Sequence, residues 1–150
     1  MAKSFFQMYG HLIFSTKNRV NWLDEEIRDE VYAYISQIFR NQDCPFVHVG
    51  GTGDHIHIFF DIGKINLTTK IIGIVKKDSS KFIKTLDAKY KDFYWQNGYA
   101  LFSVSPTNKN NVINYISIQA EHHKRMTFKE EYLAYLKKYN IEYDEKYIWD

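Results

Sequence analysis

Two histidines, His55 and His57, are spaced so that their side chains could act together in binding or catalysis. His55 and His57 are the first and third residues of the apolar stretch 55–62. Successive side chains of a strand point to opposite faces, so both imidazoles would share one face while Ile56 and Ile58 face the core. Two neutral imidazoles placed in this way can bind one divalent metal ion. The same pattern also fits polar residues on the solvated face of a half-buried strand, and the pair alone favours neither interpretation.

A third ligand and a nucleophile are available in the segment 115–123. Tyr115, Gln119 and His122 are spaced i, i+4 and i+7, which places them on one face of a helix. If this face lies over the histidine strand, the Gln119 amide can reach the metal and the Tyr115 hydroxyl lies beside it. Taken alone, any one of the twelve tyrosines fits an ordinary core or interface aromatic.

The elements that would position these residues follow the order strand, helix, strand, strand, helix, strand. Apolar periodicity and turn residues predict them at 9–17, 25–41, 45–50, 55–62, 67–86 and 100–105. Asp24 and Asn66 are the expected helix N-caps, and residues 78–80 can interrupt the second helix. This order is ferredoxin-like, as in RRM domains. Two appended helices, 109–124 and 128–138, complete a single α+β domain of residues 1–150, with the tyrosine on the appended part.

Composition sets limits on the class of protein. Apolar residues make up 45% of the chain and the net charge is only +2, as in ordinary globular proteins. No apolar run is long enough for a membrane span and no signal sequence is recognisable, so we expect a cytoplasmic protein without membrane partners. The lone Cys44 excludes an intrachain disulfide. Eight lysines between 64 and 91 predict a locally basic surface, and the aromatic residues 93–95 either stack on bases or pack in the core.

A set of ordered motifs resembles one family. The motifs lie at residues 11–14 with Lys17 and Arg19, at 55–57, at 93–99, at 102–105, at 115–119 and in the ending from 121 to 150. In this order they resemble the single-tyrosine HUH transposases of the insertion-sequence 200/605 family and their relatives associated with repeated extragenic palindromes. The resemblance covers nearly the whole chain.

The resemblance implies a reaction. Tyr115 would attack a DNA phosphodiester, form a 5′-phosphotyrosine link and release a 3′-hydroxyl that can later reverse the step. The metal ligands would be His55, His57 and Gln119. The family also implies single-stranded DNA with hairpins as partner, and homodimers in which the tyrosine helix of one subunit can complete the histidine site of the other.

The chemistry of these residue types agrees with that reaction. Two imidazoles and one amide are neutral, so the full charge of the metal would act on the phosphate. We expect Mg²⁺ or Mn²⁺, and manganese accepts histidine ligands more readily. A phenol with a pKa near 10 needs help to lose its proton, and His122 or His123 is a candidate base beside water or the metal.

Basic residues near the motifs are the candidates for DNA contact. Lys17 and Arg19 directly follow the apolar part of the first strand and can bind phosphates. Lys70, Lys76 and Lys77 of the basic stretch are further candidates.

Two other functions remain open from the residues. The first is a metal-dependent hydrolase that activates water with the histidine pair, although Phe59 stands where the longer metallo-hydrolase signature has an aspartate. The second is a nonenzymatic ferredoxin-like module that binds nucleic acid on its sheet. Such a module has no need of the two histidines, Tyr115 and Gln119 together.

Overall fold

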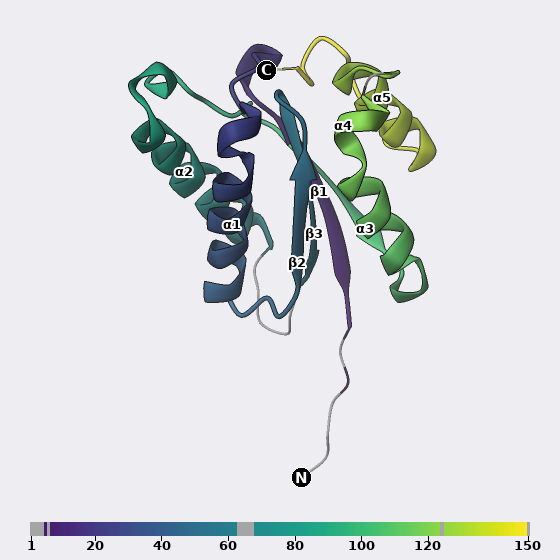
Figure 1. The fold of residues 1–150 in the computed structure, drawn as a ribbon. Coiled ribbons are helices and arrows are strands. Elements are labelled where there is room, and N and C mark those ends of the chain that lie inside the picture. The colour runs from purple at the N-terminus through teal and green to yellow at the C-terminus, as the bar shows by residue number, and fades with distance from the viewer. Residues whose placement is uncertain (1–4, 6, 63–67, 124, 150) are drawn as a thin grey trace.

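A four-stranded antiparallel sheet forms the centre of the computed structural model, which describes residues 5, 7–62, 68–123 and 125–149 (Figure 1). The strands are β1 (Tyr9–Ser15), β2 (Val47–Gly51), β3 (His55–Asp61) and β4 (Ala100–Val104), in the spatial order β2-β3-β1-β4. All three neighbouring pairs are antiparallel. This order, with a helix after β1 and after β3, confirms the predicted ferredoxin-like α+β fold.

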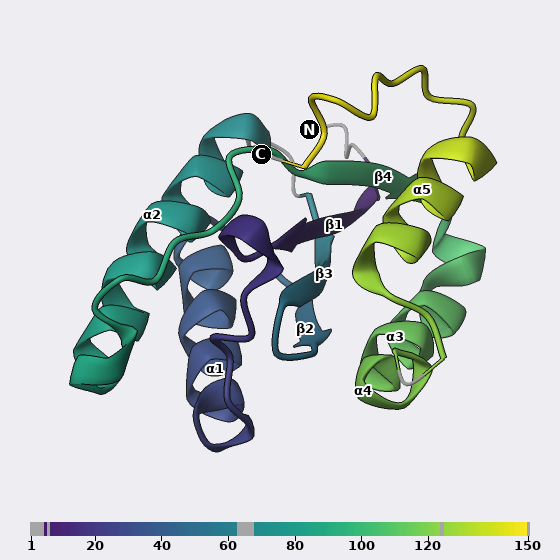
Figure 2. The same ribbon diagram turned by 90° about the horizontal axis from the view of Figure 1, so that it is seen from above.

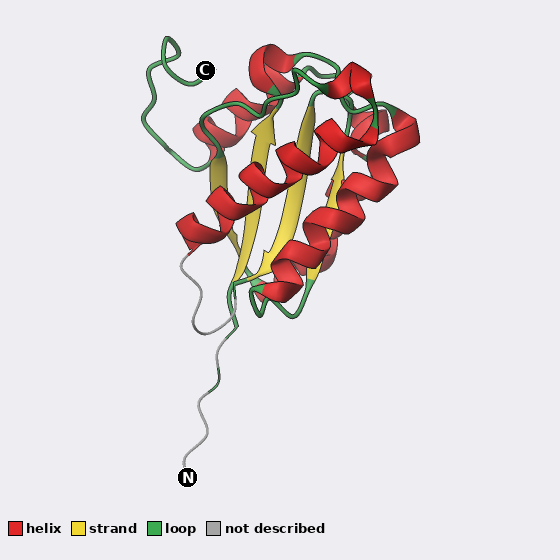
Figure 3. Cartoon of the chain, turned by 90° about the vertical axis from the view of Figure 1, so that its left-hand side faces the viewer, coloured by secondary structure: helices red, strands yellow, loops and turns green. Residues whose placement is uncertain are grey.

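Helices cover both faces of the sheet, as the view from above shows (Figure 2). Helices α1 (Glu25–Asn41) and α2 (Thr68–Leu86) lie side by side over one face (Figure 3). Three C-terminal helices cover the other: α3 (Lys109–Ser117), α4 (Gln119–His122) and α5 (Phe128–Lys138). Short 3-10 turns lie at Lys17–Arg19, Ala88–Tyr90 and Pro106–Asn108.

The alternation of side chains along β3 divides the core into two layers. Ile56, Ile58 and Phe60 belong to the large cluster beneath α1 and α2. His55 and His57 point to the opposite face, where both are fully buried. The interpretation of this face as solvated is therefore wrong, because α3 to α5 cover it. Apolar periodicity within a strand indicates two faces, but it does not reveal that both are packed.

Several boundaries differ from the sequence-based expectation. Helix α2 continues through 78–80, where Ser79 is buried and its hydroxyl donates to the Val75 carbonyl within the helix. The expected helix 109–124 is divided at Ile118 into α3 and α4. Asp24 occupies the N-cap position of α1, but its carboxylate accepts from the Tyr90 hydroxyl instead of capping the helix. The expected cap Asn66 lies outside the described residues. Within the part of the chain that the structure describes, no helix is long and apolar enough to cross a membrane.

Candidate active site

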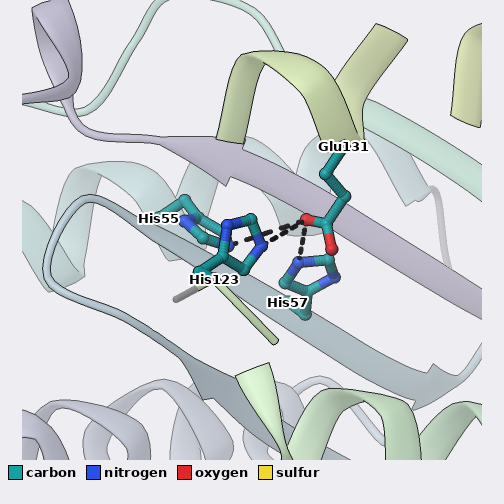
Figure 4. A group of neighbouring side chains, drawn as sticks. All are labelled: His55, His57, His123 and Glu131. Carbon is teal, nitrogen blue, oxygen red and sulfur yellow. Dashed lines mark hydrogen bonds and ion pairs between the residues drawn. The ribbon is translucent and has the colours of Figure 1, made fainter. Parts of the chain in front are cut away.

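The two histidines of β3 aim their Nε2 atoms at one buried point (Figure 4). Their rings lie 5.2 Å apart between centroids, and neither side chain is exposed to solvent. The flanking strands hold them in register, since His57 pairs with Ile13 of β1 on one side and with Gly50 of β2 on the other. The site is therefore built on the rigid centre of the sheet.

A second set of side chains fixes the orientation of both rings. His55 Nδ1 lies 2.7 Å from the carboxylate of Asp54, which also accepts from Thr52. His57 Nδ1 lies 2.8 Å from Nε2 of His11, a buried residue of β1. Burial lowers the pKa of His11 well below its usual value, so this ring is neutral. Hydrogen bonds at Nδ1 leave Nε2 of a ligand histidine free to bind a metal, and such partners also orient the ring.

Gln119 lies where the helical spacing predicts it. It is the first residue of α4, it is fully buried, and its Oε1 lies 3.2 Å from Nε2 of His55. Its amide nitrogen donates to the carbonyl of Tyr115, 3.2 Å away. The donation turns the amide oxygen toward the histidines.

Glu131 of α5 is the residue that the sequence reasoning missed. It is only 1% exposed, and its Oε1 lies 2.8 Å from His57 Nε2 and 3.1 Å from His123 Nε2. Burial alone would raise the pKa of this carboxyl, but the close contacts with His123 and His57 outweigh burial and hold the pKa far below its usual value. A signal did exist. Glu131 stands among Phe128 and Tyr132 on the buried face of α5, where a charged residue needs a partner.

The Tyr115 hydroxyl lies directly beside this cluster. It donates to Oε2 of Glu131 and lies 3.4 Å from Nε2 of His122. Burial, and then the negative charge of Glu131, raise the pKa of Tyr115 far above its usual value, so the phenol keeps its proton at neutral pH. A pocket of about 430 Å³ between α3 and α5 is lined by Tyr115, Glu131 and Tyr135. Tyr115 is half-buried and can be reached through this pocket.

The donor atoms fit a divalent metal ion. Four of them, from His55, His57, His123 and Glu131, lie within 4.8 Å of one another, and Gln119 adds an amide oxygen. Ligands about 2.0–2.2 Å from a common ion lie roughly 3 Å apart, as Glu131 Oε1 does from His57 and His123. The more widely separated donors must move slightly closer for all four to bind one ion. The carboxylate changes the expected charge of the site, since the predicted set of two histidines and Gln119 is neutral. It also supplies the anionic oxygen that magnesium and manganese prefer.

The basic residues expected to contact DNA differ in their exposure and in their hydrogen bonds within the chain. Lys17, Lys70 and Lys77 are exposed. Arg19 donates to the carbonyl of Trp149, and Lys76 donates to two carbonyls of the loop before β4. The three lysines of this set that belong to α2 lie across the sheet from Tyr115 (Figure 2).

The fold and the site together define a class. A ferredoxin-like sheet with a buried histidine pair and a tyrosine on a following helix is the architecture of a single-tyrosine HUH transposase. The chain belongs to the IS200-like transposase family, whose model matches residues 4–119. This match includes His55, His57, Tyr115 and Gln119, while His123 and Glu131 lie beyond it.

Solved structures share the fold. One is a protein assigned as a transposase from Deinococcus radiodurans R1, with a TM-score of 0.61 and 19% identity over 80% of this chain and 98% of that chain. Another is a REP-associated tyrosine transposase bound to a REP hairpin, with a TM-score of 0.56 and 15% identity over 82% of this chain and 73% of that one. No curated protein matches the sequence significantly.

Proposed function

We propose that this transposase cleaves and rejoins single-stranded DNA through a 5′-phosphotyrosine intermediate at Tyr115, with a divalent metal ion held by His55, His57 and Gln119. One observation carries the proposal. The carboxylate of Glu131 contacts His57 through one oxygen and the Tyr115 hydroxyl through the other. The nucleophile and the metal donors therefore meet at a single buried point of one chain.

The residues of the chain account for the nucleophilic step. The phenol oxygen of Tyr115 attacks phosphorus while its proton leaves through Glu131 Oε2, which already accepts its hydrogen bond, and passes on to water, because a carboxyl with so low a pKa does not retain it. The bond from phosphorus to the 3′-oxygen breaks, and that oxygen leaves as a hydroxyl after taking a proton from water. The reverse reaction with a new 3′-hydroxyl rejoins the strands without ATP, because the tyrosyl ester conserves the bond.

The metal ion supplies positive charge to the scissile phosphate when it is bound. We propose Mg²⁺ or Mn²⁺ in this role. Glu131 and His123 are additional donors that the sequence did not predict, and Glu131 supports either ion because it adds a carboxylate oxygen.

DNA with a hairpin is the proposed partner, and the similar transposase bound to a REP hairpin supports this choice. Lys17, Lys70 and Lys77 are proposed phosphate contacts because their side chains are exposed. Arg19 and Lys76 belong to the same proposal, but Arg19 must first release one carbonyl within the chain and Lys76 must release two. A homodimer in which the two subunits exchange their tyrosine helices is a further proposed arrangement.

The reaction has a direct test. Wild-type protein is incubated with labelled single-stranded DNA containing a hairpin and with Mg²⁺ or Mn²⁺, and a covalent protein–DNA adduct is sought after denaturation. Tyr115→Phe should abolish the adduct. Tyr139→Phe is the matched control, because Tyr139 is an exposed tyrosine outside the site, and it should leave the adduct intact.

The same assay separates the alternatives. If Tyr115→Phe still cleaves DNA and His57→Ala does not, the protein is a water-activating hydrolase and the phosphotyrosine mechanism is wrong. If wild-type protein binds hairpin DNA but cleaves none under any of these conditions, the binding module is the correct function.

A further inference from the structure

A second groove lies on the side of the sheet opposite Tyr115. Helix α2 forms one wall and the segment 94–97 forms the other, and the groove encloses about 420 Å³. Lys77, Lys81 and Lys84 follow one another on the same face of α2 at spacings of four and three residues. No acidic side chain lines the groove among the described residues. The groove therefore attracts an anion.

A buried donor without a partner lies in the wall of this groove. Gln96 is 1% exposed, and its Oε1 accepts from the backbone N–H of Ser15 at 2.7 Å. Its Nε2 has no hydrogen-bond partner among the described residues. A buried donor that is left unpaired is costly, and a ligand with an acceptor oxygen would satisfy it.

An exposed aromatic ring adds a second kind of contact. Tyr94 is 55% exposed, although its neighbours Phe93 and Trp95 are buried. The ammonium group of Lys84 lies 4.1 Å from the centre of the Tyr94 ring. A ring in this position beside lysines is suited to stack on an unpaired nucleic-acid base.

Gly73 leaves the backbone of α2 open beside the groove. It lies within the helix and lines the groove, and a Cβ added there would have no atom within 4 Å. Glycine weakens a helix relative to alanine. Packing within the chain does not require this glycine, and the open space above it leaves room for a ligand to approach the helix backbone.

We propose that this groove binds a single-stranded segment of the DNA substrate, with phosphates against Lys77 and Lys81 and one unpaired base on Tyr94. This assignment rests on the proposed function, because it concerns the same DNA. The groove has the volume of sites for small ligands, which suits one or two nucleotides and not a duplex.

The end of β1 connects the groove with the active site. The N–H of Lys17 donates to the carbonyl of Tyr94, and the N–H of Thr16 donates to the carbonyl of Asp54, the residue before His55. Lys17 is exposed at this junction. A bound strand would thus be held at the end of the sheet where the histidines lie.

Binding measurements that need no cleavage test the groove. The probes are fluorescein-labelled oligo(dT) and a labelled hairpin with single-stranded flanks, measured by anisotropy over a range of salt concentrations with the full chain. Replacing Lys77 and Lys81 together by Ala should make the negative slope of log affinity against log salt shallower by about 1.4, since each phosphate contact contributes about 0.7 on single strands. Tyr94→Ala should weaken binding roughly 5- to 150-fold, the equivalent of one lost stack.

Gly73→Ala distinguishes a binding role from a structural one. We expect the melting temperature to rise by about 2–4 °C, since a helical glycine is replaced. DNA affinity should fall at the same time, because the methyl group stands where the strand approaches. The double change of Lys137 and Lys146 to Ala is the control. It removes the same charge from exposed positions outside the groove. This control variant should therefore bind DNA more tightly than the variant that lacks Lys77 and Lys81.

The outcomes for the groove and for the reaction are separable. If the groove variants bind both probes as tightly as the control, the groove assignment is wrong, whether or not the adduct forms. If these variants lose affinity while wild-type protein forms no adduct with any DNA, the groove stands and the proposed reaction fails. If wild-type protein binds neither probe, both fail.

Discussion

The residues of the site differ in how well the sequence alone predicts them. His55 and His57 follow from alternation along a strand, and Tyr115 with Gln119 follows from one helical turn. The first relation lies within one strand and the second spans four residues across the short break between α3 and α4, so local geometry predicts both. Glu131 belongs to another helix, and its approach to His57 depends on how α5 packs on the sheet. The apolar pattern of α5 identifies its buried face, but it does not name the partner across the interface.

Glu131 gives a prediction at the scale of the residue. Glu131→Gln keeps the shape and one amide oxygen, but it removes the carboxylate that accepts the hydrogen bond of Tyr115. We expect the rate of adduct formation to fall by about 10²- to 10⁴-fold, the usual contribution of a positioned base. The rate is measured on denaturing gels at saturating metal, so that weaker metal binding does not limit it.

A neighbouring residue supplies the control. Glu130→Gln removes the same negative charge from an exposed position. Glu130 belongs to the capping box of α5, in which glutamine can take the place of glutamate. This variant should react like wild type. A rate for Glu131→Gln equal to that of Glu130→Gln would show that Tyr115 does not need the carboxylate.

At the scale of the element, the sheet was more predictable than the packing of the helices on it. The strands were recognisable because apolar residues alternate and turn residues bound them. The break between α3 and α4 was not recognisable from the sequence. Ser117 donates its hydroxyl to the Ile113 carbonyl, a back-bond that bends helices, and the chain then restarts at Gln119. The apolar periodicity continues through this break and conceals it.

The contact of α3 with β2 is unusually close and yields a second prediction. A Cβ on Gly50 would lie 2.5 Å from the carbonyl oxygen of Ile116, the residue after Tyr115. Since that neighbour is backbone, α3 itself must move. Gly50→Ala should therefore destabilise the fold by about 1–3 kcal/mol, as overpacking does, and slow adduct formation by displacing Tyr115.

Urea unfolding and the adduct assay measure these two effects. Gly98→Ala is the matched change, because its added Cβ would meet its nearest atom at an ordinary 3.7 Å. Normal stability and rate in Gly50→Ala would mean that α3 is not held as closely as this contact indicates.

At the scale of the whole molecule, the question is whether one chain builds a complete site. The segment between β4 and α3 consists of Ser105 and the short turn Pro106–Asn108. Beyond it, α3 buries Ile116 against Phe59 of the same chain, and α5 buries Phe128 against Ile13. Exchange of these helices between two subunits would preserve the contacts and change only the hinge, so the sequence leaves both arrangements open.

Mixing two inactive variants decides between the two arrangements. Tyr115→Phe keeps the histidines, and His57→Ala keeps the tyrosine. Because Tyr115 lies beside the histidines of its own chain, we expect the mixture to form no adduct, even after the proteins are unfolded and refolded together. With a size tag on the His57→Ala chain, an adduct that migrates with the tagged chain would instead mean that a tyrosine attacks DNA in the site of its partner. Light scattering at the same concentrations reports whether dimers are present, so that an inactive mixture of dimers still argues for a site complete within one chain.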